Sequence, residues 1–211
     1  MTFKDISFHD PSKNLDYDDE LLRQADKGTG EEVLRFWESP LYFIVLGRTS
    51  SVETDVNEPA ALSDGIPILR RSSGGGTVLQ GPGCLNFSLV LSKIRRPELE
   101  SIQNSYKCIL ELILKRMEEL QVQGDFRPVS DLVLKSSEKK FSGNAQRRGR
   151  TYILHHGTIL YNFNLELISR YLKMPPKQPE YRRGRTHHDF VTNIPAAASG
   201  LKAVITKAFI D

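Results

Sequence analysis

Three consecutive glycines follow two arginines in residues 70–78, which read RRSSGGGTV. Glycines at positions 74–76 leave the backbone amides uncovered and allow positive φ, so these amides can converge on an anion. Arg70 and Arg71 supply planar guanidinium donors that suit phosphate or carboxylate. The alternative is a flexible turn between strands, but the flanking arginines favour anion binding. The segment has neither the Gly-Lys-Ser/Thr of a P-loop nor the GxGxxG of a dinucleotide fingerprint.

A second segment, residues 139–146, reads KKFSGNAQ and sets two lysines beside small residues. Small residues let a flat ligand lie against the backbone, while an ammonium neutralises an acid group on that ligand. The alternative is a pair of surface lysines in a hairpin turn. Taken alone, the segment favours the surface pair, so its chemistry depends on what folds against it.

Two adjacent histidines, His155 and His156, stand in a stretch that predicts a β-strand over residues 153–160. Neighbouring side chains on a strand point to opposite faces, so only one of the two can face a pocket. This spacing argues against a metal site built from the pair. The inward histidine is either a hydrogen-bonded core residue or a substrate contact, and the sequence leaves both open. No Ser-His-Asp arrangement or HExxH motif is apparent.

The elements that must position these residues follow from apolar periodicity. Helices are predicted over residues 14–24, 101–120, 165–172 and 199–210, the second with a broad apolar stripe. Strands are predicted over residues 34–37, 41–46, 66–70, 77–79, 85–91, 131–135, near 140–142 and over 153–160. Many strands, few helices and little strict alternation predict an α+β fold with mixed or antiparallel β-sheets flanked by helices.

The length and composition of the chain restrict the classes of protein to which it can belong. The 211 residues suit a single domain, and 39% hydrophobic and 26% charged residues are ordinary for a globular protein. No apolar run approaches the roughly 20 residues of a membrane span, and the N-terminus has no signal core. We therefore expect a cytoplasmic protein with no membrane partner. Two cysteines, Cys84 and Cys108, imply no disulfide framework.

The net charge of +3 is mildly basic, and the basic residues cluster at several places along the chain. Most of these clusters are interpreted as solvated faces. An anionic partner, such as a nucleotide or an acidic protein surface, is the alternative. We expect no nucleic-acid partner.

Taken together, the segments resemble the catalytic domain of the biotin/lipoate protein ligases, and within that family the lipoate–protein ligase branch. The matching segments occur in order along nearly the whole chain: residues 14–15, 47–48, 70–78, 85–88, 130–133, 140–145, 155–158 and 191–193. The resemblance implies a mixed sheet flanked by helices, a fold like that of class II aminoacyl-tRNA synthetases, and a bent substrate channel. It further implies one catalytic domain over residues 1–211 without the C-terminal accessory domain that many lipoate ligases carry.

The resemblance also implies a two-step reaction with ATP and Mg²⁺. The carboxylate of lipoate, or of a close medium-chain analogue, attacks the α-phosphate of ATP and expels pyrophosphate. The ε-amine of a carrier lysine then attacks the acyl-adenylate and releases AMP. The implied partners are lipoyl carrier domains, either 2-oxoacid dehydrogenase E2 domains or glycine-cleavage H-type proteins. A separate accessory chain is a further implied partner.

Site residues follow from the same resemblance. Lys140 is the implied catalytic residue, touching the acyl carbonyl oxygen and the adenylate phosphate. The implied ATP or adenylate contacts are Arg70, Arg71, Gly75, Gly76, Thr77, Val78, Leu79, Asp131 and Lys140. The implied lipoate contacts are Ser73, Gly74, Gly75, Asn86, Lys140, Gly143, Ala145 and His156. Asp131 is the candidate Mg²⁺ ligand. The candidates for an apolar slot are Val78, Leu79, Phe87 and the inward side of residues 153–160.

Two other activities fit the same resemblance. Octanoyl- and lipoyl-transferases share the domain but use a cysteine nucleophile and no ATP. Residues 152–155 and the region around 130–131, where such cysteines fall, contain none. Cys84, expected on the loop after the glycines, is the remaining candidate. Cys108, on the helix with the apolar stripe, is expected in the hydrophobic core. A non-catalytic subunit that binds the carrier is the other alternative. The sequence leaves open the choice of lipoate or octanoate, the carrier, the oligomeric state, the need for an accessory chain and the general base.

Overall fold

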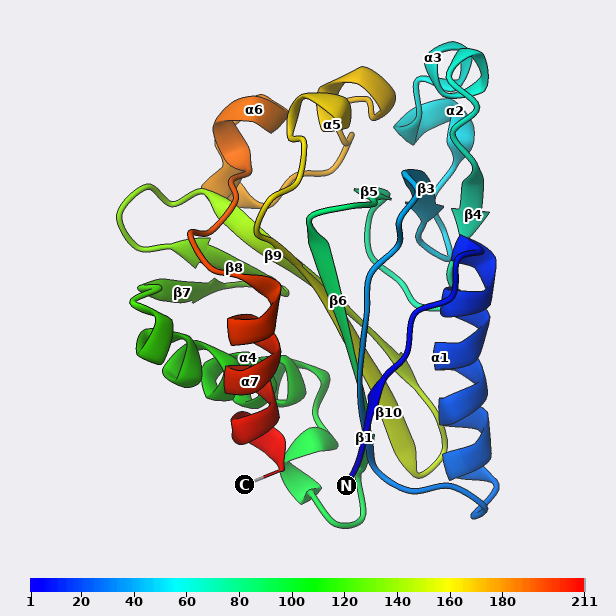
Figure 1. Cartoon of the computed structure of the whole chain (residues 1–211), viewed down its shortest axis with the longest axis vertical. Helices are drawn as coiled ribbons and strands as arrows, with labels where there is room; N and C mark the ends of the chain where they lie inside the picture. Colours follow the sequence, from blue (N-terminus) through cyan, green and yellow to red (C-terminus); the bar gives the residue numbers. More distant parts are fainter. Residues whose placement is uncertain (211) are drawn as a thin grey trace.

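A seven-stranded sheet forms the centre of the molecule in the computed structural model, which describes residues 1–210 (Figure 1). Its strand order is β1-β2-β6-β10-β9-β8-β7, and every neighbouring pair is antiparallel except β1 with β2. The strands are β1 (Thr2–Asp5), β2 (Val33–Trp37), β6 (Cys84–Ser92), β7 (Gly124–Arg127), β8 (Asp131–Leu134), β9 (Lys140–Arg148) and β10 (Tyr152–Leu160).

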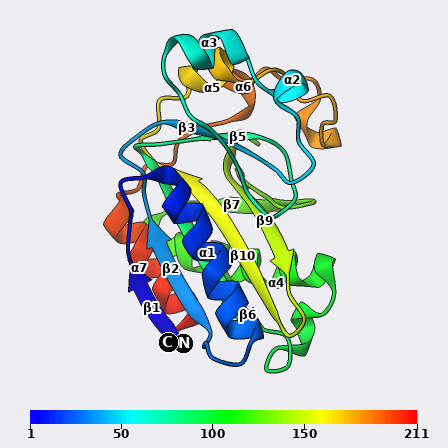
Figure 2. The same cartoon turned by 90° about the vertical axis from the view of Figure 1, so that its right-hand side faces the viewer.

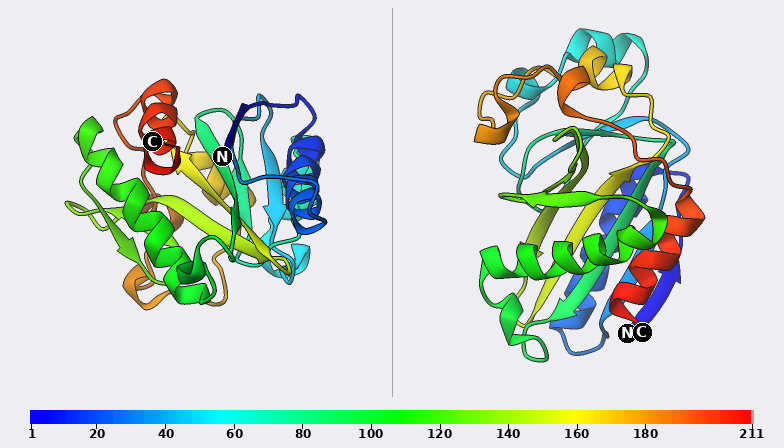
Figure 3. Two further views of the ribbon diagram at one scale, coloured as in Figure 1. Left: turned by 90° about the horizontal axis from the view of Figure 1, so that it is seen from below. Right: turned by 90° about the vertical axis from the view of Figure 1, so that its left-hand side faces the viewer.

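Helices cover both faces of this sheet. Figure 1 shows α4 (Ile102–Met117) and α7 (Ala198–Phe209) on one face and α1 (Pro11–Asp26) on the other. Figure 3 shows α4 and α7 lying next to each other, in agreement with their mutual contacts. Within the part of the chain that the structure describes, no helix is both long enough and apolar enough to cross a membrane.

A second, three-stranded sheet lies beyond one end of the large sheet, with strand order β4-β3-β5 (Figure 2). Its strands are β3 (Phe43–Leu46), β4 (Ile68–Arg70) and β5 (Val78–Gln80). Short helices gather around it, namely α2 (Val52–Asp55), α3 (Glu58–Ser63), α5 (Glu166–Tyr171) and α6 (His187–Phe190). Three 3₁₀ turns complete the fold: η1 (Pro97–Leu99), η2 (Glu118–Leu120) and η3 (Glu180–Arg182).

The main hydrophobic core lies between the large sheet and the pair α4 and α7. Ser101 caps α4 by accepting a hydrogen bond from the Asn104 amide, and one stripe of the helix is buried. The buried stripe holds most of the residues predicted from apolar spacing, but Ile102, also predicted there, is exposed. The core members are apolar residues of the sheet and of the two helices, including Leu34, Phe36, Phe87, Leu89, Ile109, Ile113, Phe141, Leu201 and Ile205.

Polar contacts set the position of α1 on the opposite face. Asp10 caps the helix, and Leu21, Leu22 and Ala25 pack on the sheet at its C-terminal half. Nearer its N-terminus, the carboxylate of Asp18 lies 2.7 Å from the fully buried guanidinium of Arg35 in β2. Removing one partner of such a buried pair typically costs about 3–5 kcal/mol, because the other charge is left buried alone. The pair therefore fixes the helix against the sheet.

The structure confirms the α+β class and the four predicted helices, with bounds that differ by up to three residues. The strand expected near residues 140–142 continues to Arg148 as β9. The sequence reading missed β1, β7, α2, α3 and α6, which are all four to six residues long. Elements this short hold too few residues for a periodic pattern to stand out.

Candidate functional site

The antiparallel register of the large sheet brings predicted site residues together on the face that α1 covers in part. One row across four strands consists of Asp131, Gly143, Thr158 and Asn86. The next row holds Ala145, His156 and Ser88. Paired residues on an antiparallel sheet point to the same face, so these side chains share one surface. Thr158 and Ser88 are the two members that the sequence reading missed.

Lys140, the first residue of β9, lies over this surface. Its ammonium is 2.7 Å from Oδ1 of Asp131. Its side chain crosses above Gly143, because a β-carbon added there would lie 2.9 Å from the lysine Nζ. Because residue 143 is a glycine, there is space above it for the lysine side chain. The structure brings the predicted lysine, carboxylate and glycine into direct contact.

Arg71 organises the glycine loop, residues 71–77. Its Nη2 donates to the carbonyl oxygens of Gly74, at 2.8 Å, and Gly76, at 2.7 Å. Across a trans peptide the carbonyl and the following amide point in opposite directions. The N–H groups of Gly75 and Thr77 therefore point away from Arg71. Burial lowers the pKa of Arg71 to about 10, so the guanidinium stays cationic at pH 7. Arg71 thus shapes the loop and adds positive charge behind it.

The base of the loop is tied to the end of β3. The amide of Arg48 donates to the Ser73 carbonyl at 2.9 Å. The carbonyl oxygen of Gly75 lies so close to Gly47 that a β-carbon there would be only 1.9 Å away. Arg70 directs its Nη1 to three backbone carbonyls, those of residues 47, 48 and 50, at 2.8–3.1 Å. Arg70 therefore also supports the backbone beneath the loop.

The loop reaches the large sheet at two points. Ser73 Oγ lies 2.7 Å from Nε2 of His156 in β10. A β-carbon built on Gly75 would lie 3.9 Å from the methyl group of Ala145 in β9. Ala145 is two residues along the strand from Gly143, a spacing of roughly 7 Å. The glycine loop and the side chain of Lys140 therefore lie over the same face of one strand.

The two histidines face opposite sides of the sheet, as the sequence predicts. His156 borders a small cavity of about 20 Å³ beneath the loop, and burial lowers its pKa well below the usual range, with the Arg71 cation adding to the effect. His155 lies fully buried between Phe87 and Tyr106 in the main core. The cavity is lined by Leu15, Asp18, Asp19, Arg71, Ser72, Ser73, Leu154 and His156.

The sequence that forms this arrangement of loop, lysine and sheet matches a known protein family. Residues 10–209 match the sequence profile of the family described as Lipoyl protein ligase A/B catalytic domain. The chain belongs to this family. The match spans nearly the whole chain, and it confirms the resemblance that the ordered motifs indicated.

Individual relatives of this lipoyl ligase family member agree with the assignment. A Mycoplasma pneumoniae protein named "Probable lipoate-protein ligase A" is 29% identical over 164 residues, covering 78% of this chain and 46% of its own length. A Schizosaccharomyces pombe protein named "Putative lipoate-protein ligase A" is 31% identical over 132 residues, which are 63% of this chain and 34% of its own length. The chain thus spans less than half the length of these relatives.

Solved structures show the same fold. A Thermoplasma acidophilum structure, described as a bi-partite lipoate protein ligase and its E2 lipoyl domain, has a TM-score of 0.85 at 21% identity, covering 99% of this chain and 81% of that one. A lipoate-protein ligase A bound with ATP has a TM-score of 0.78 at 23% identity, covering 99% and 83%. The ligase catalytic-domain fold predicted from the sequence is therefore confirmed.

In this ligase-family chain, the residues predicted to line an apolar slot lie elsewhere. Phe87 belongs to the main core and stacks on His155, so it lies on the opposite face of the sheet from His156. Val78 packs in a cluster beside β3, and Leu79 packs in another cluster beneath α5. The assignment of Phe87 to the slot was wrong. The apolar residues that do line the cavity are Leu15 and Leu154.

Cys84 also differs from expectation. It is the first residue of β6, not a loop residue, and it is buried. Burial raises the pKa of its thiol to about 12, with the charge of Glu38 adding to the shift. Cys108 on α4 is partly exposed, where a core position was expected. A thiol with so high a pKa as that of Cys84 forms almost no thiolate at pH 7 and is a poor nucleophile.

Tyr181 is a further residue at this site that sequence reasoning missed. Its hydroxyl donates to Oδ2 of Asp131 at 2.6 Å, on the carboxylate that Lys140 contacts through Oδ1. Tyr181 belongs to the turn η3, far from both partners in the sequence. The surrounding letters, EYRRGR, read as a charged loop and carry no signal for this contact.

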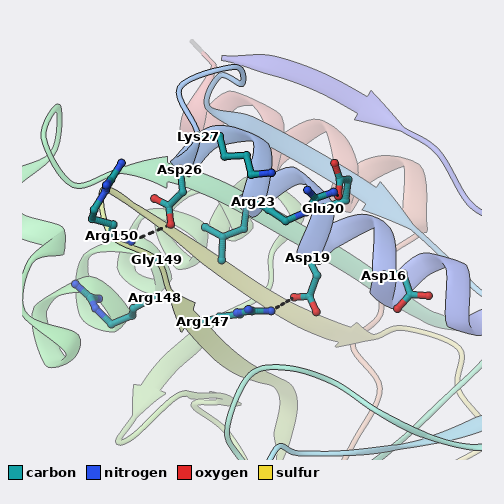
Figure 4. A pocket seen from close by; sticks show the side chains of 11 residues that line it. Asp16, Asp19, Glu20, Arg23, Asp26, Lys27, Arg147, Arg148, Gly149 and Arg150 are labelled. Carbon is teal, nitrogen blue, oxygen red and sulfur yellow. Dashed lines mark hydrogen bonds and ion pairs between the residues drawn. The ribbon is translucent and has the colours of Figure 1, made fainter.

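A larger polar hollow of about 510 Å³ lies elsewhere, between α1 and the turn that joins β9 to β10 (Figure 4). It is lined by Asp16, Asp19, Glu20, Leu22, Arg23, Asp26, Lys27, Arg147, Arg148, Gly149 and Arg150. None of the predicted site residues borders it. Asp19 borders both this hollow and the small cavity, since it contacts Ser72 in the glycine loop and Arg147 in β9. Within residues 1–210, no group of three or more His, Cys, Asp or Glu could hold a metal ion.

Proposed function

We propose that the chain joins lipoate to a lysine of a lipoyl carrier domain through a lipoyl-adenylate made from ATP. The observation that carries this proposal is the meeting of the glycine loop and Lys140 on one face of β9. Outward-pointing amides and an ammonium on one surface suit a single anionic ligand. An acyl-adenylate has such an anion, its phosphate, next to the acyl carbonyl.

The first step joins two anions, the carboxylate of the acid and the triphosphate. A carboxylate oxygen forms a bond to the α-phosphorus while the bond to the pyrophosphate oxygen breaks. The amides of Gly75 and Thr77 and the ammonium of Lys140 would stabilise the charge that develops at phosphorus. Arg71 acts from behind the loop. Gly76, Val78 and Leu79 continue the loop into β5 and remain predicted nucleotide contacts.

The second step breaks the bond between the acyl carbon and the phosphate. The carrier amine attacks the carbonyl carbon, AMP leaves, and the amine proton must be accepted because its free pKa is about 10.4. Lys140 would stabilise the carbonyl oxygen. Asp131 and the departing phosphate are the two candidate proton acceptors.

Mg²⁺ usually binds proteins through one or two carboxylates and takes its remaining ligands from substrate phosphates and water. Asp131 is the carboxylate that fits this pattern here. Both of its oxygens already have partners, Lys140 and Tyr181. Because its oxygens are already engaged, Asp131 would supply only part of the coordination of the ion, and the phosphates would supply the rest. The ion would neutralise charge on the triphosphate.

The acyl chain would lie beneath the glycine loop, next to Ser73 and His156. The cavity of about 20 Å³ there has room for roughly one water molecule, whereas sites for small organic ligands occupy about 300 Å³ or more. The loop must therefore lift to admit the chain. Contacts of Ser72 with Asp19 and of Ser73 with His156 would break as it does so.

The octanoyl- or lipoyl-transferase alternative has weaker support. It requires a thiolate near the acyl group, and Cys84 is buried with a raised pKa. A non-catalytic carrier-binding subunit is the second alternative. It does not account for a lysine held over a glycine on the same face of β9 as the glycine loop.

The proposal is tested by intact mass measurement of a lipoyl carrier domain after incubation with the purified chain, ATP and lipoate. We expect the domain to gain one lipoyl group, only when ATP is present. Octanoate in place of lipoate tests acyl preference. A gain from a thioester donor without ATP supports the transferase alternative. Binding of the domain without any modification, from any donor and with a candidate accessory chain added, supports the binding-subunit alternative.

A further inference from the structure

The segment between α5 and α7 contributes a tyrosine to the surface that holds Lys140. The hydroxyl of Tyr181 donates to one oxygen of Asp131 at 2.6 Å, and the ammonium of Lys140 contacts the other oxygen at 2.7 Å. Each oxygen of the carboxylate is therefore engaged by a different partner.

The tyrosine is itself held in place. Its ring packs at 5.3 Å from the ring of Phe190. Arg185 donates to the carbonyl of Tyr181 at 2.9 Å, and it also reaches the Glu138 carbonyl in the turn before β9. Arg182 lies 4.5 Å above the Phe190 ring. The turn that carries Tyr181 is thus fixed to the turn that leads into β9, the strand that begins with Lys140.

Backbone contacts strengthen this connection. The amide of Thr192 donates to the Lys140 carbonyl at 2.9 Å, and Val191 forms an isolated parallel bridge with Lys140. The Nζ of Lys139 reaches the His188 carbonyl at 3.3 Å. The segment can therefore orient groups around Lys140 without touching the ammonium.

We propose that Tyr181 is a positioning residue, which holds the carboxylate of Asp131 so that the ammonium of Lys140 stays above Gly143. A carboxylate with one partner can rotate about the bond that joins it to the side chain. A second hydrogen bond, to the other oxygen, fixes its plane and thereby the direction of Oδ1. When Lys140 turns to the substrate, the hydroxyl remains as a partner for the carboxylate. This role in catalysis rests on the proposed function.

The test is Tyr181→Phe, which removes the hydroxyl and keeps the ring that packs on Phe190. The matched control is Tyr171→Phe. Tyr171 also donates to a carboxylate, that of Asp64, at 2.8 Å, in the cluster around the small sheet. Comparison of the two variants separates the loss of this particular hydrogen bond from the loss of any tyrosine hydroxyl.

The first readout is steady-state kinetics of lipoate-dependent AMP formation. We expect Tyr181→Phe to lower kcat about tenfold, a typical effect of removing a group that orients a functional side chain, and to leave the KM for lipoate near that of the Tyr171→Phe control. If the two tyrosine variants have equal kcat while Lys140→Ala is inactive, the role of Tyr181 is overturned and the proposed function stands. Full activity in Lys140→Ala overturns the proposed function instead.

The second readout needs no turnover. Competitive acetylation with acetic anhydride, followed by peptide mass spectrometry, measures how accessible each lysine amine is. We expect Lys140 to be acetylated several-fold faster in Tyr181→Phe than in Tyr171→Phe, because a loosely held carboxylate protects it less. Lys202, paired with Asp5 at 2.8 Å, is the internal standard. An unchanged acetylation rate at Lys140 overturns the positioning role, whatever the protein's activity.

Discussion

Gly75 in the glycine loop lies against Ala145 in β9, with 3.9 Å between the Ala145 methyl group and a β-carbon built on Gly75. The contact joins two motifs 70 positions apart in the chain. It places the loop beside Gly143, above which the side chain of Lys140 lies. The proposed acyl-adenylate site needs both motifs, so it depends on that meeting.

Gly76→Ala is expected to fold normally and to bind nucleotide poorly. A β-carbon at Gly76 would meet no atom within 4 Å, and its φ lies outside the left-handed region, so the protein accommodates the methyl group. The methyl group would instead stand where a phosphate approaches the loop. We expect an unchanged melting temperature and about tenfold weaker ATP binding, a loss of about 1.4 kcal/mol. Calorimetric titration with ATP checks this, and unchanged affinity would place the nucleotide elsewhere.

Gly143→Ala is expected to displace Lys140 without unfolding the chain. The added β-carbon would lie 2.9 Å from the lysine Nζ, which is the far end of a flexible side chain and can move aside. Activity should therefore fall toward that of Lys140→Ala, for which a loss on the order of 10²–10³ in rate is typical of a missing charge-stabilising donor. The measurement is single-turnover formation of lipoyl-adenylate. Wild-type rates in Gly143→Ala would show that the position of the lysine above this residue is unimportant.

Cys84→Ser is expected to leave turnover intact. The thiol is buried and its pKa is raised to about 12, so almost none of it is ionised at pH 7. We also expect the native protein to resist alkylation at Cys84 by iodoacetamide, while Cys108 on α4, which is partly exposed, reacts first. Loss of acyl transfer in Cys84→Ser, together with a thioester detected by mass spectrometry, would favour the transferase alternative.

His155 should make the fold sensitive to mild acid. Burial lowers its pKa from 6.5 to about 3. Below pH 6.5 the unfolded chain therefore binds a proton at this position that the folded chain excludes, and stability falls as the pH drops from 6.5 towards 3. Between pH 7 and pH 5 the expected loss from this group is about 2 kcal/mol.

The matched variant for this prediction is His155→Phe, which keeps a ring between Phe87 and Tyr106 and cannot titrate. Urea unfolding at pH 7 and pH 5 gives the loss of unfolding free energy for each protein. We expect the wild type to lose about 2 kcal/mol more than the variant. Equal losses would mean that His155 is protonated in the folded state.

Much of the candidate site could be predicted from the sequence, since most of its residues lie in short contiguous motifs. Residues 70–78 and 139–146 contain the glycines, the arginines and the lysine in order, and each motif folds as one unit. The opposite orientation of His155 and His156 follows from the geometry of any strand. The helix over residues 102–117 follows from its apolar stripe, which only one face of a helix can bury.

The remaining features depend on contacts that no local pattern records. Phe87 is an exception, because residues 85–89 alternate apolar with polar, and this pattern alone places Phe87 on the opposite face of β6 from the predicted lipoate contact Asn86. In the sequence, Arg70 and Arg71 are typical of phosphate ligands, yet in the structure both donate hydrogen bonds to backbone carbonyls. Tyr181 lies 50 residues from Asp131, and only the folded chain brings the two together.

The central claim, that the glycine loop and Lys140 bind one anion, is tested most directly by a double-mutant cycle. The measurement is the binding free energy of a non-hydrolysable lipoyl-adenylate analogue to the wild type, Gly76→Ala, Lys140→Ala and the double variant. If both groups contact one phosphate, the two losses are coupled by about 0.5 kcal/mol or more. Losses that add to within about 0.3 kcal/mol, or full affinity in Lys140→Ala, would contradict the account.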